Sequence, residues 1–172
     1  QTMITGVILA GGLGRRMGGT DKGLQELNGK PMAQWAAERL APQVDELLIN
    51  ANQNSERYAA LGYRIVADEV PDFAGPLAGL LSAARTAQQA WLLTVPTDAP
   101  FLPLDLVGRL HDHAMANDLP LVRAADETGI HYALMLVRRE LMGDLEDYVR
   151  EGGRQVKAWQ DRHPNDTLYF GE

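Results

Sequence analysis

The chain has 172 residues, of which 45% are hydrophobic and 23% are charged, and its formal net charge is −7. This length and composition are typical of one globular domain with a single buried core. The acidic balance argues against a broad nucleic-acid surface, which needs a basic face. The sequence contains no cysteine, so disulfides and thiolate metal sites are excluded.

No apolar run reaches the roughly 18 residues that a membrane-spanning helix needs, and no signal peptide is visible. We therefore expect a cytoplasmic protein, without a membrane segment or a nucleic-acid partner.

Strands and helices are expected to alternate along the chain. The first strand is the β-branched run Ile4–Leu9, which ends at Gly11-Gly12 as a buried strand does when it enters a turn. Further strands are expected over 47–49, 63–67, 91–95, 119–124 and 132–137. Helices are expected over 31–40, 76–88, 103–115, 140–150 and 155–162, the first three opening on a proline, which suits the first helical turn. This alternation predicts an α/β fold: three layers, Rossmann-like, with a mainly parallel sheet between helices. We expect residues 1–172 to form one domain.

Polar residues follow the ends of four predicted strands. Gly11-Gly12, Asn50, Asp68 and Asp98 each come directly after an apolar run. If these strands are parallel, all four groups meet at one edge of the sheet, where such folds bind ligands. The competing interpretation is that Asn and Asp simply favour turns.

The segment from Leu9 to Lys22 is the strongest functional signal. Its glycines allow the backbone to approach an anion closely, and its arginines and lysine supply charge-assisted donors for phosphates. The segment is not a Walker loop, because Thr20-Asp21 follows where Lys-Ser/Thr is needed. It is not a dinucleotide fingerprint either, because Met17 stands where glycine is needed. We therefore predict a nucleoside triphosphate here, against the alternative of a flexible surface loop.

The sequence resembles the molybdenum cofactor guanylyltransferases from about Thr5 to about Val137. Generic sugar-phosphate nucleotidyltransferases share the Leu-Ala-Gly-Gly start but usually carry a longer insertion after it. Related cytidylyltransferases tend to have Leu-Ala-Ala-Gly, so Gly11 favours guanine. The resemblance is carried by Leu9-Ala10-Gly11-Gly12, Arg16-Met17-Gly18, Asp21-Lys22, Asn28-Gly29-Lys30-Pro31, Asn50-Ala51-Asn52, Asp68, Gly75-Pro76-Leu77-Ala78-Gly79 and Pro96-Thr97-Asp98-Ala99-Pro100.

This resemblance implies a role for each matching residue. Asp98 ligates Mg²⁺, the expected cofactor, and acts in catalysis with Arg16 and Lys22, which grip the triphosphate. Asp68 lies toward the guanine. The residues implied in nucleotide binding are Leu9, Ala10, Gly11, Gly12, Lys22, Asn50, Asp68 and Asp98, and those near the second substrate are Gly75, Gly79 and Arg154. A hard ion such as Mg²⁺ does prefer carboxylate and phosphate oxygens. The other interpretations are a turn cap for Asp98 and solvated surface charges for Arg16, Lys22 and Arg154.

The chain departs from the family pattern at two places. The family usually ends in an Asn-x-Asn-Thr-Pro segment after a last strand, whereas this chain ends Leu168-Tyr169-Phe170-Gly171-Glu172, so a C-terminal segment is expected to be missing. The family also often has His-Pro before its late strand, whereas His131 is followed here by Tyr132. His131 is interpreted either as a substrate contact or as a structural histidine.

The resemblance implies that GMP passes from GTP to the terminal phosphate of molybdopterin, with release of pyrophosphate. It also implies transient contact with proteins that mature molybdoenzymes. Two alternatives stay open: a nucleotidyltransferase that uses CTP or a sugar-phosphate acceptor, and a non-catalytic GTP-binding protein that loads the cofactor.

Overall fold

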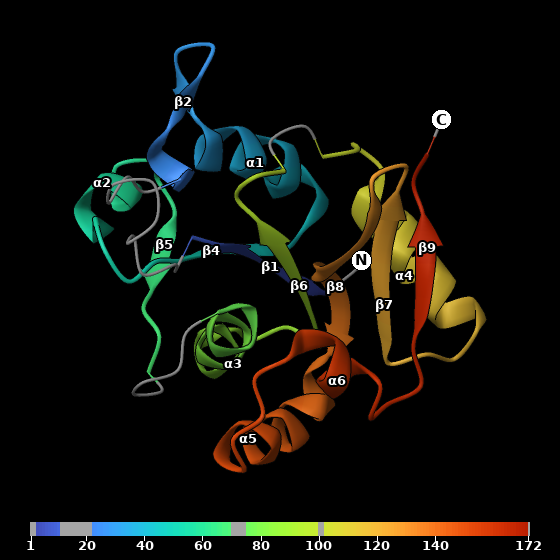
Figure 1. Cartoon of the computed structure of the whole chain (residues 1–172). Helices are drawn as coiled ribbons and strands as arrows, with labels where there is room; N and C mark the ends of the chain where they lie inside the picture. Colours follow the sequence, from blue (N-terminus) through green and yellow to red (C-terminus); the bar gives the residue numbers. More distant parts are fainter. Residues whose placement is uncertain (1–2, 11–21, 70–74, 100–101, 172) are drawn as a thin grey trace.

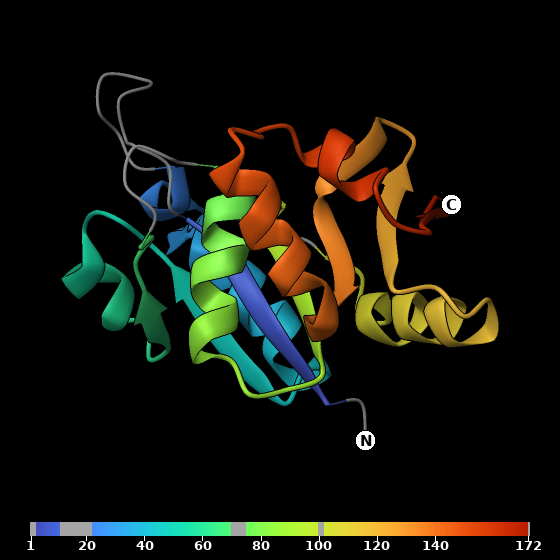
Figure 2. The same cartoon turned by 90° about the horizontal axis from the view of Figure 1, so that it is seen from below.

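The computed structural model describes residues 3–10, 22–69, 75–99 and 102–171. A seven-stranded sheet runs through its centre in the order β5-β4-β1-β6-β8-β7-β9, and β2 and β3 form a separate two-stranded sheet. Both faces of the large sheet are covered by helices, as Figure 1 and Figure 2 show. The predicted three-layer α/β fold is therefore confirmed.

The strands have the following bounds: β1 Ile4–Leu9, β2 Glu26–Leu27, β3 Lys30–Pro31, β4 Glu46–Asn50, β5 Arg64–Val66, β6 Trp91–Pro96, β7 Leu121–Asp126, β8 Gly129–Arg138 and β9 Asp166–Tyr169. The α-helices are α1 Met32–Leu40, α2 Ser55–Ala59, α3 Pro76–Thr86, α4 Leu106–Ala116, α5 Met142–Arg150 and α6 Val156–Gln160. Short 3₁₀ turns are η2 Lys22–Leu24, η3 Ala41–Gln43 and η4 Arg139–Leu141. All six predicted strands and all five predicted helices are present, with shifted ends.

Two apolar cores lie on opposite faces of the sheet. Helices α1 and α4 cover one face, and α3, α5 and α6 cover the other. The central strand β1 contributes to both cores because its side chains alternate: Ile4 and Ile8 face α1, and Val7 faces α3. A strand buried on both faces is rich in apolar residues, and the polar Thr5 is accommodated in β1 because its hydroxyl donates to Glu46 Oε1 at 2.7 Å.

Strand direction changes at the middle of the sheet. Strands β5, β4, β1 and β6 are parallel, but β8 is antiparallel to both β6 and β7. Only the two residues Glu127 and Thr128 separate β7 from β8. So short a link forces neighbouring strands to be antiparallel, because a parallel pair needs a long crossover. The two consecutive strands predicted over 119–124 and 132–137 are therefore an antiparallel hairpin, and the predicted mainly parallel sheet is confirmed, with β8 as the strand that runs the other way.

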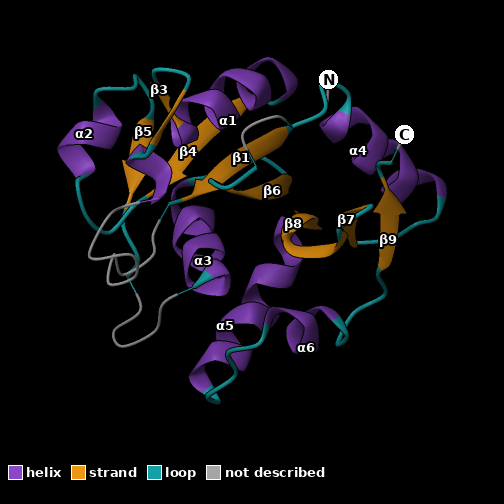
Figure 3. Ribbon diagram, turned by 45° about the horizontal axis from the view of Figure 1, so that its top comes forward, coloured by secondary structure: helices purple, strands orange, loops and turns teal. Residues whose placement is uncertain are grey.

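Three short elements were not predicted: the β2–β3 hairpin, helix α2 and strand β9. The hairpin turns at Asn28-Gly29, whose φ angles of 55° and 81° lie in the left-handed region. Strand β9 pairs in parallel with β7 and extends the sheet at that edge. Figure 3 shows the half-sheet β8-β7-β9 with α4 on one side and α6 on the other.

Candidate functional site

The carboxyl ends of four parallel strands meet at one rim of the sheet. In the register, Leu9 pairs with both Asn50 and Pro96, and Asn50 pairs with Val66. Asp68 and Asp98 follow two residues after β5 and β6, on the same rim. The predicted convergence is thus confirmed for Asn50, Asp68 and Asp98.

The structure describes only the two ends of the predicted phosphate loop. Leu9 ends β1, and the Ala10 amide donates to the Asn50 carbonyl at 2.8 Å, which ties the start of the loop to β4. Gly11, Gly12 and Arg16 lie outside the described residues. Lys22 opens the turn η2, which precedes α1 and contacts it. The functional roles of these residues stay predictions.

Asn50 links the ends of β4 and β5. Its side chain is only 2% exposed, and its Nδ2 donates to the Val66 carbonyl at 3.1 Å and to Asp68 Oδ1 at 2.8 Å. Asn52 supports the same carboxylate: its Nδ2 donates to Asp68 Oδ2 at 2.8 Å, and its Oδ1 accepts from the Asp68 amide at 2.7 Å. The half-buried Asp68 is therefore held in one orientation at the rim, and Asn50 would act on a nucleotide through Asp68.

Glycine is needed at two positions near the start of α3, for a different structural reason at each. Gly75 precedes the helix with φ of 113°, a conformation that side chains rarely adopt. A Cβ on Gly79 would lie 2.6 Å from Asn50 Oδ1 and 2.7 Å from Leu9 Cδ2. Gly79 therefore lets α3 pack directly beneath the rim. This packing supports the part of the rim formed by Leu9 and Asn50, and the acceptor role implied for both glycines stays a prediction.

Asp98 lies at the edge of a pocket of about 490 Å³. The pocket opens between the loop after β6, the start of α4 and the β7–β8 hairpin. Its walls are largely apolar, and its polar side chains come from the loop after β6 and from the hairpin. The lining residues are Pro96, Asp98, Ala99, Leu102, Pro103, Leu106, Ala124, Ala125, Asp126, Glu127, Thr128, His131, Leu134 and Phe170.

A hydrogen-bonded cluster forms the hairpin side of this pocket. Asp126 Oδ1 accepts from the Thr128 hydroxyl at 2.6 Å and from the Thr128 amide at 2.9 Å, and it lies 2.9 Å from His131 Nε2. The Thr128 hydroxyl, joined by His131, lowers the pKa of Asp126 to about 2. The Asp126 carboxylate is therefore ionised at neutral pH. His131 lines the pocket, so the structure agrees with the substrate-contact interpretation of this residue without testing it.

Arg154 does not line the pocket. It lies between α5 and α6, on the opposite face of the sheet from α4, and its Nη1 donates to the carbonyls of Val149 at 3.3 Å and Gly153 at 2.8 Å. These are carbonyls at and just after the end of α5, where arginine side chains commonly hydrogen-bond; the Val149 carbonyl also accepts from the Gly152 amide at 3.0 Å. This contact is a structural role for Arg154, and its acceptor role stays a prediction.

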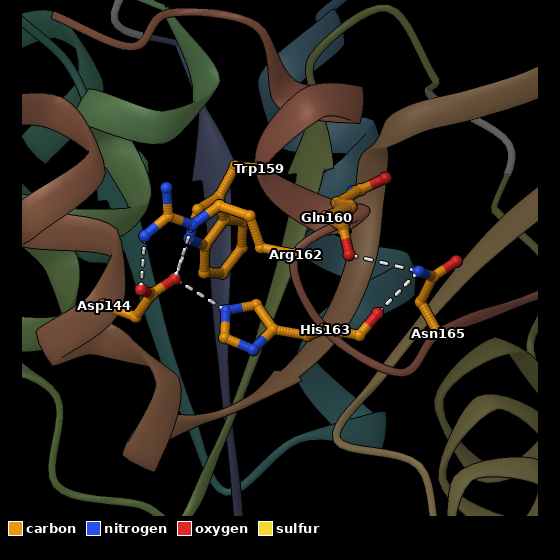
Figure 4. Close-up of polar contacts among 6 residues, drawn as sticks. All are labelled: Asp144, Trp159, Gln160, Arg162, His163 and Asn165. Atoms are coloured by element: carbon orange, nitrogen blue, oxygen red, sulfur yellow. Dashed lines mark hydrogen bonds and ion pairs between the residues drawn. The ribbon is translucent and has the colours of Figure 1, made fainter. Parts of the chain in front are cut away.

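A second polar cluster joins α6 to α5, as Figure 4 shows. Asp144 accepts from Arg162 Nη2 at 2.7 Å and from Trp159 Nε1 at 3.0 Å, and its Oδ2 lies 2.7 Å from His163 Nε2. The bond from Arg162 is the main cause that lowers the pKa of Asp144 to about 2. Trp159 itself is fully buried in the core beside α5, so this cluster holds α6 and the residues after it against α5.

The donor set at the rim fits a metal ion that arrives with phosphates. Among the described residues no group of three or more His, Asp or Glu side chains is placed to hold a metal. Asp98 is exposed, and its carboxylate forms no hydrogen bond or ion pair with another described residue. Mg²⁺ typically takes one or two protein carboxylates, substrate phosphates and water. Asp98 therefore fits Mg²⁺ as the protein ligand of a nucleotide-borne ion.

Sequence reasoning missed the hairpin residues Asp126, Glu127 and Thr128. They follow a predicted strand, as Asn50 and Asp68 do, so the rule that found the other rim residues could have found them. The predicted strands 119–124 and 132–137 left these residues in the connection between them, and only the structure shows that β7 and β8 extend to a two-residue turn. The structure also shows no described helix with the length and apolarity that crossing a membrane requires.

Comparisons with known proteins agree with this arrangement. The model of the MobA-like NTP transferase domain matches residues 6–166. A molybdenum cofactor guanylyltransferase of Ralstonia nicotianae is 46% identical, over 98% of this chain and 87% of that protein. One from a Shewanella species is also 46% identical, over 93% of this chain and 81% of that protein.

Solved structures show the same fold at low sequence identity. The molybdopterin-guanine dinucleotide biosynthesis protein A of Archaeoglobus fulgidus has a TM-score of 0.75 at 18% identity, over 97% of this chain and 83% of that chain. A CMP:2-keto-3-deoxy-manno-octonic acid synthetase complexed with CTP has a TM-score of 0.78 at 15% identity, over 98% and 90%. These structures therefore show the fold alone, and the family follows from the domain match and the sequence relatives. The rim geometry agrees with the domain match and with those relatives. This chain belongs to the MobA-like nucleotidyltransferases, in the family of the molybdenum cofactor guanylyltransferases.

Proposed function

We propose that this chain transfers the GMP group of GTP to the terminal phosphate of molybdopterin, which forms molybdopterin guanine dinucleotide and releases pyrophosphate. The observation that carries the proposal is the position of Asp98. It stands on the rim shared with Asp68 and with the start of the predicted phosphate loop, and it also lines the adjoining pocket. The Asp98 carboxylate thus borders both the rim, where the nucleotide would bind, and the pocket, where the acceptor would bind.

The proposed reaction needs no nucleophilic side chain. An anionic oxygen of the acceptor phosphate attacks the α-phosphorus of GTP in line, a new P–O bond forms, and the bond to the β-phosphate oxygen breaks as pyrophosphate leaves. Because the attacking oxygen of the acceptor phosphate is already ionised at neutral pH, no general base is required. Mg²⁺ held by Asp98 would neutralise phosphate charge.

The remaining residues would position the substrates. Asp68, fixed by Asn50 and Asn52, would lie toward the guanine. Lys22 and Arg16 would hold the triphosphate by charge-assisted hydrogen bonds. Positioning and charge neutralisation would carry most of the rate enhancement. We also propose that the protein is cytoplasmic and that it makes transient contacts with molybdoenzyme-maturation proteins.

Two measurements separate this proposal from the alternatives. Calorimetric titration with GTP, ATP, CTP and UTP in Mg²⁺ should show binding of GTP alone, whereas CTP binding would favour a cytidylyl or broader nucleotidyltransferase. Pyrophosphate release in the presence of molybdopterin should accompany turnover, whereas GTP binding without release would favour a non-catalytic loading protein.

Asp98→Asn should reduce pyrophosphate release at least about 100-fold with the fold intact, because the metal loses its protein ligand. The matched control is Asp112→Asn, an exposed aspartate on α4 outside the pocket lining. Near-normal turnover by Asp98→Asn would refute the metal role of Asp98.

A further inference from the structure

The polar lining of the pocket beside Asp98 is rich in hydrogen-bond acceptors. Among the described residues that line it, three are carboxylates (Asp98, Asp126 and Glu127) and one, His131, is basic. Such a lining disfavours a free anion and favours a ligand edge that donates hydrogen bonds. The volume of about 490 Å³ and the apolar walls suit a flat heterocycle of small-molecule size.

Glu127, one of these three carboxylates, lies at the tip of the β7–β8 hairpin. Asp126 and Gly129 pair across the hairpin, and the bonds of Asp126 to Thr128 and His131 fix the backbone on both sides of Glu127. Asp126 is therefore occupied within the protein. Glu127, in contrast, is exposed, lines the pocket and forms no hydrogen bond or ion pair with another described residue.

The two ends of the acceptor differ in the chemistry that they need. Its phosphate end is anionic and has to reach the metal at Asp98. Its pterin end is a flat ring whose amino-pyrimidinone edge offers an exocyclic N–H and a ring N–H side by side. A carboxylate accepts two such parallel N–H bonds, and these charge-assisted pairs are among the stronger hydrogen bonds.

We propose that Glu127 determines acceptor specificity: its carboxylate accepts both N–H bonds of the amino-pyrimidinone edge of the pterin, which lies in the pocket between α4 and the β7–β8 hairpin. This inference rests on the proposed function and adds the residue that recognises the ring. Guanine carries the same donor edge, so the test has to separate a pterin in this pocket from the guanine of GTP.

The first test is fluorescence titration with pterin and with lumazine, which has a carbonyl in place of the 2-amino group. The wild-type chain should bind pterin about 10- to 100-fold more tightly than lumazine, since one donor of the pair is missing. Glu127→Gln should abolish this preference. The matched control is Glu140→Gln, an exposed glutamate of η4 beyond the other end of β8, which should retain it. Absence of pterin binding, equal binding of the two rings, or an unchanged preference in Glu127→Gln would overturn the proposal.

The second test is steady-state kinetics with molybdopterin as acceptor. Glu127→Gln should raise the KM for molybdopterin at least about tenfold and leave the KM for GTP within about twofold. A rise in the KM for GTP instead would place guanine in the pocket and overturn the proposal, while continued guanylyl transfer would leave the proposed function standing. If Glu127→Gln unfolds by circular dichroism, Glu127→Asp, which shortens the reach of the carboxylate, takes its place. If wild type releases no pyrophosphate, the proposed function fails, and the titration with the two rings still decides the role of Glu127.

Discussion

Substituting Gly79 by alanine should destabilise the fold and weaken nucleotide binding together. The added Cβ would lie 2.6 Å from Asn50 Oδ1 and 2.7 Å from Leu9 Cδ2. Leu9 has a flexible side chain, but the Asn50 amide is held by Val66 and Asp68 and moves only if those bonds distort. Overpacking of this kind typically costs about 1–3 kcal/mol.

Alanine also has a higher helix propensity than glycine, by about 1 kcal/mol, which offsets part of this cost. Gly108→Ala on α4 isolates the packing effect, because it gains the same propensity and its Cβ would meet nothing within 4 Å. The difference in the free energy of unfolding between the two variants should therefore be about 1–3 kcal/mol. For a chain of this size, Gly79→Ala should melt about 2–12 °C below Gly108→Ala.

The assay combines thermal melting with GTP titration. Gly79→Ala should bind GTP more weakly, because displacement of Asn50 removes a donor from Asp68, and Gly108→Ala should bind GTP as wild type does. If both variants melt together, the rim adapts without cost, and the close packing of α3 beneath Asn50 is not a constraint. If Gly79→Ala is destabilised but binds GTP normally, Asn50 does not position a nucleotide-binding residue.

Two further predictions concern Asp144 and Asp68. Asp144→Asn should lower the free energy of unfolding by about 1–2 kcal/mol at pH 7, measured by urea denaturation. The pKa of this carboxyl falls from 3.8 to about 2, and its 31% exposure reduces the effect below the full shift. Because the folded-state pKa is depressed, the contribution is present above about pH 4 and is lost as the pH falls toward 2. A difference that persists at pH 2 would contradict this reasoning, and Asp147→Asn, an exposed neighbour on α5, is the control. Asp68→Ala should reduce the preference for GTP over ATP in calorimetric titration, and an unaltered ratio would mean that the base is read elsewhere.

Much of the site was predictable because the rim follows from strand periodicity. An apolar run that ends in Asn50, Asp68 or Asp98 identifies a buried strand and its carboxyl end, and parallel pairing then brings these ends together. This reasoning needs only local sequence patterns and one rule of topology. It identified three described residues that the structure does place on one rim.

The contacts that give these residues their roles were not predictable in the same way. The buried bond from Asn50 to Asp68 and the approach of Gly79 beneath Asn50 join segments separated by 18 and 29 positions. The first contact depends on how β5 pairs with β4 and the second on how α3 crosses the sheet, and the periodicity of a single segment specifies neither. Arg154 shows the same limit, since its contacts with carbonyls near the end of α5 are visible only in the folded chain.

The sequence by itself determined the α/β fold, the order of the main elements and the strand ends that carry polar residues, because these depend on local periodicity and turn chemistry. The tertiary structure alone decided that β8 lies antiparallel between β6 and β7, and that the β7–β8 hairpin forms a pocket with the start of α4. It also decided that Asp144 holds α6 against α5. These features depend on which distant segments pair and pack, and burial of both faces of the sheet selects that pairing for the whole chain.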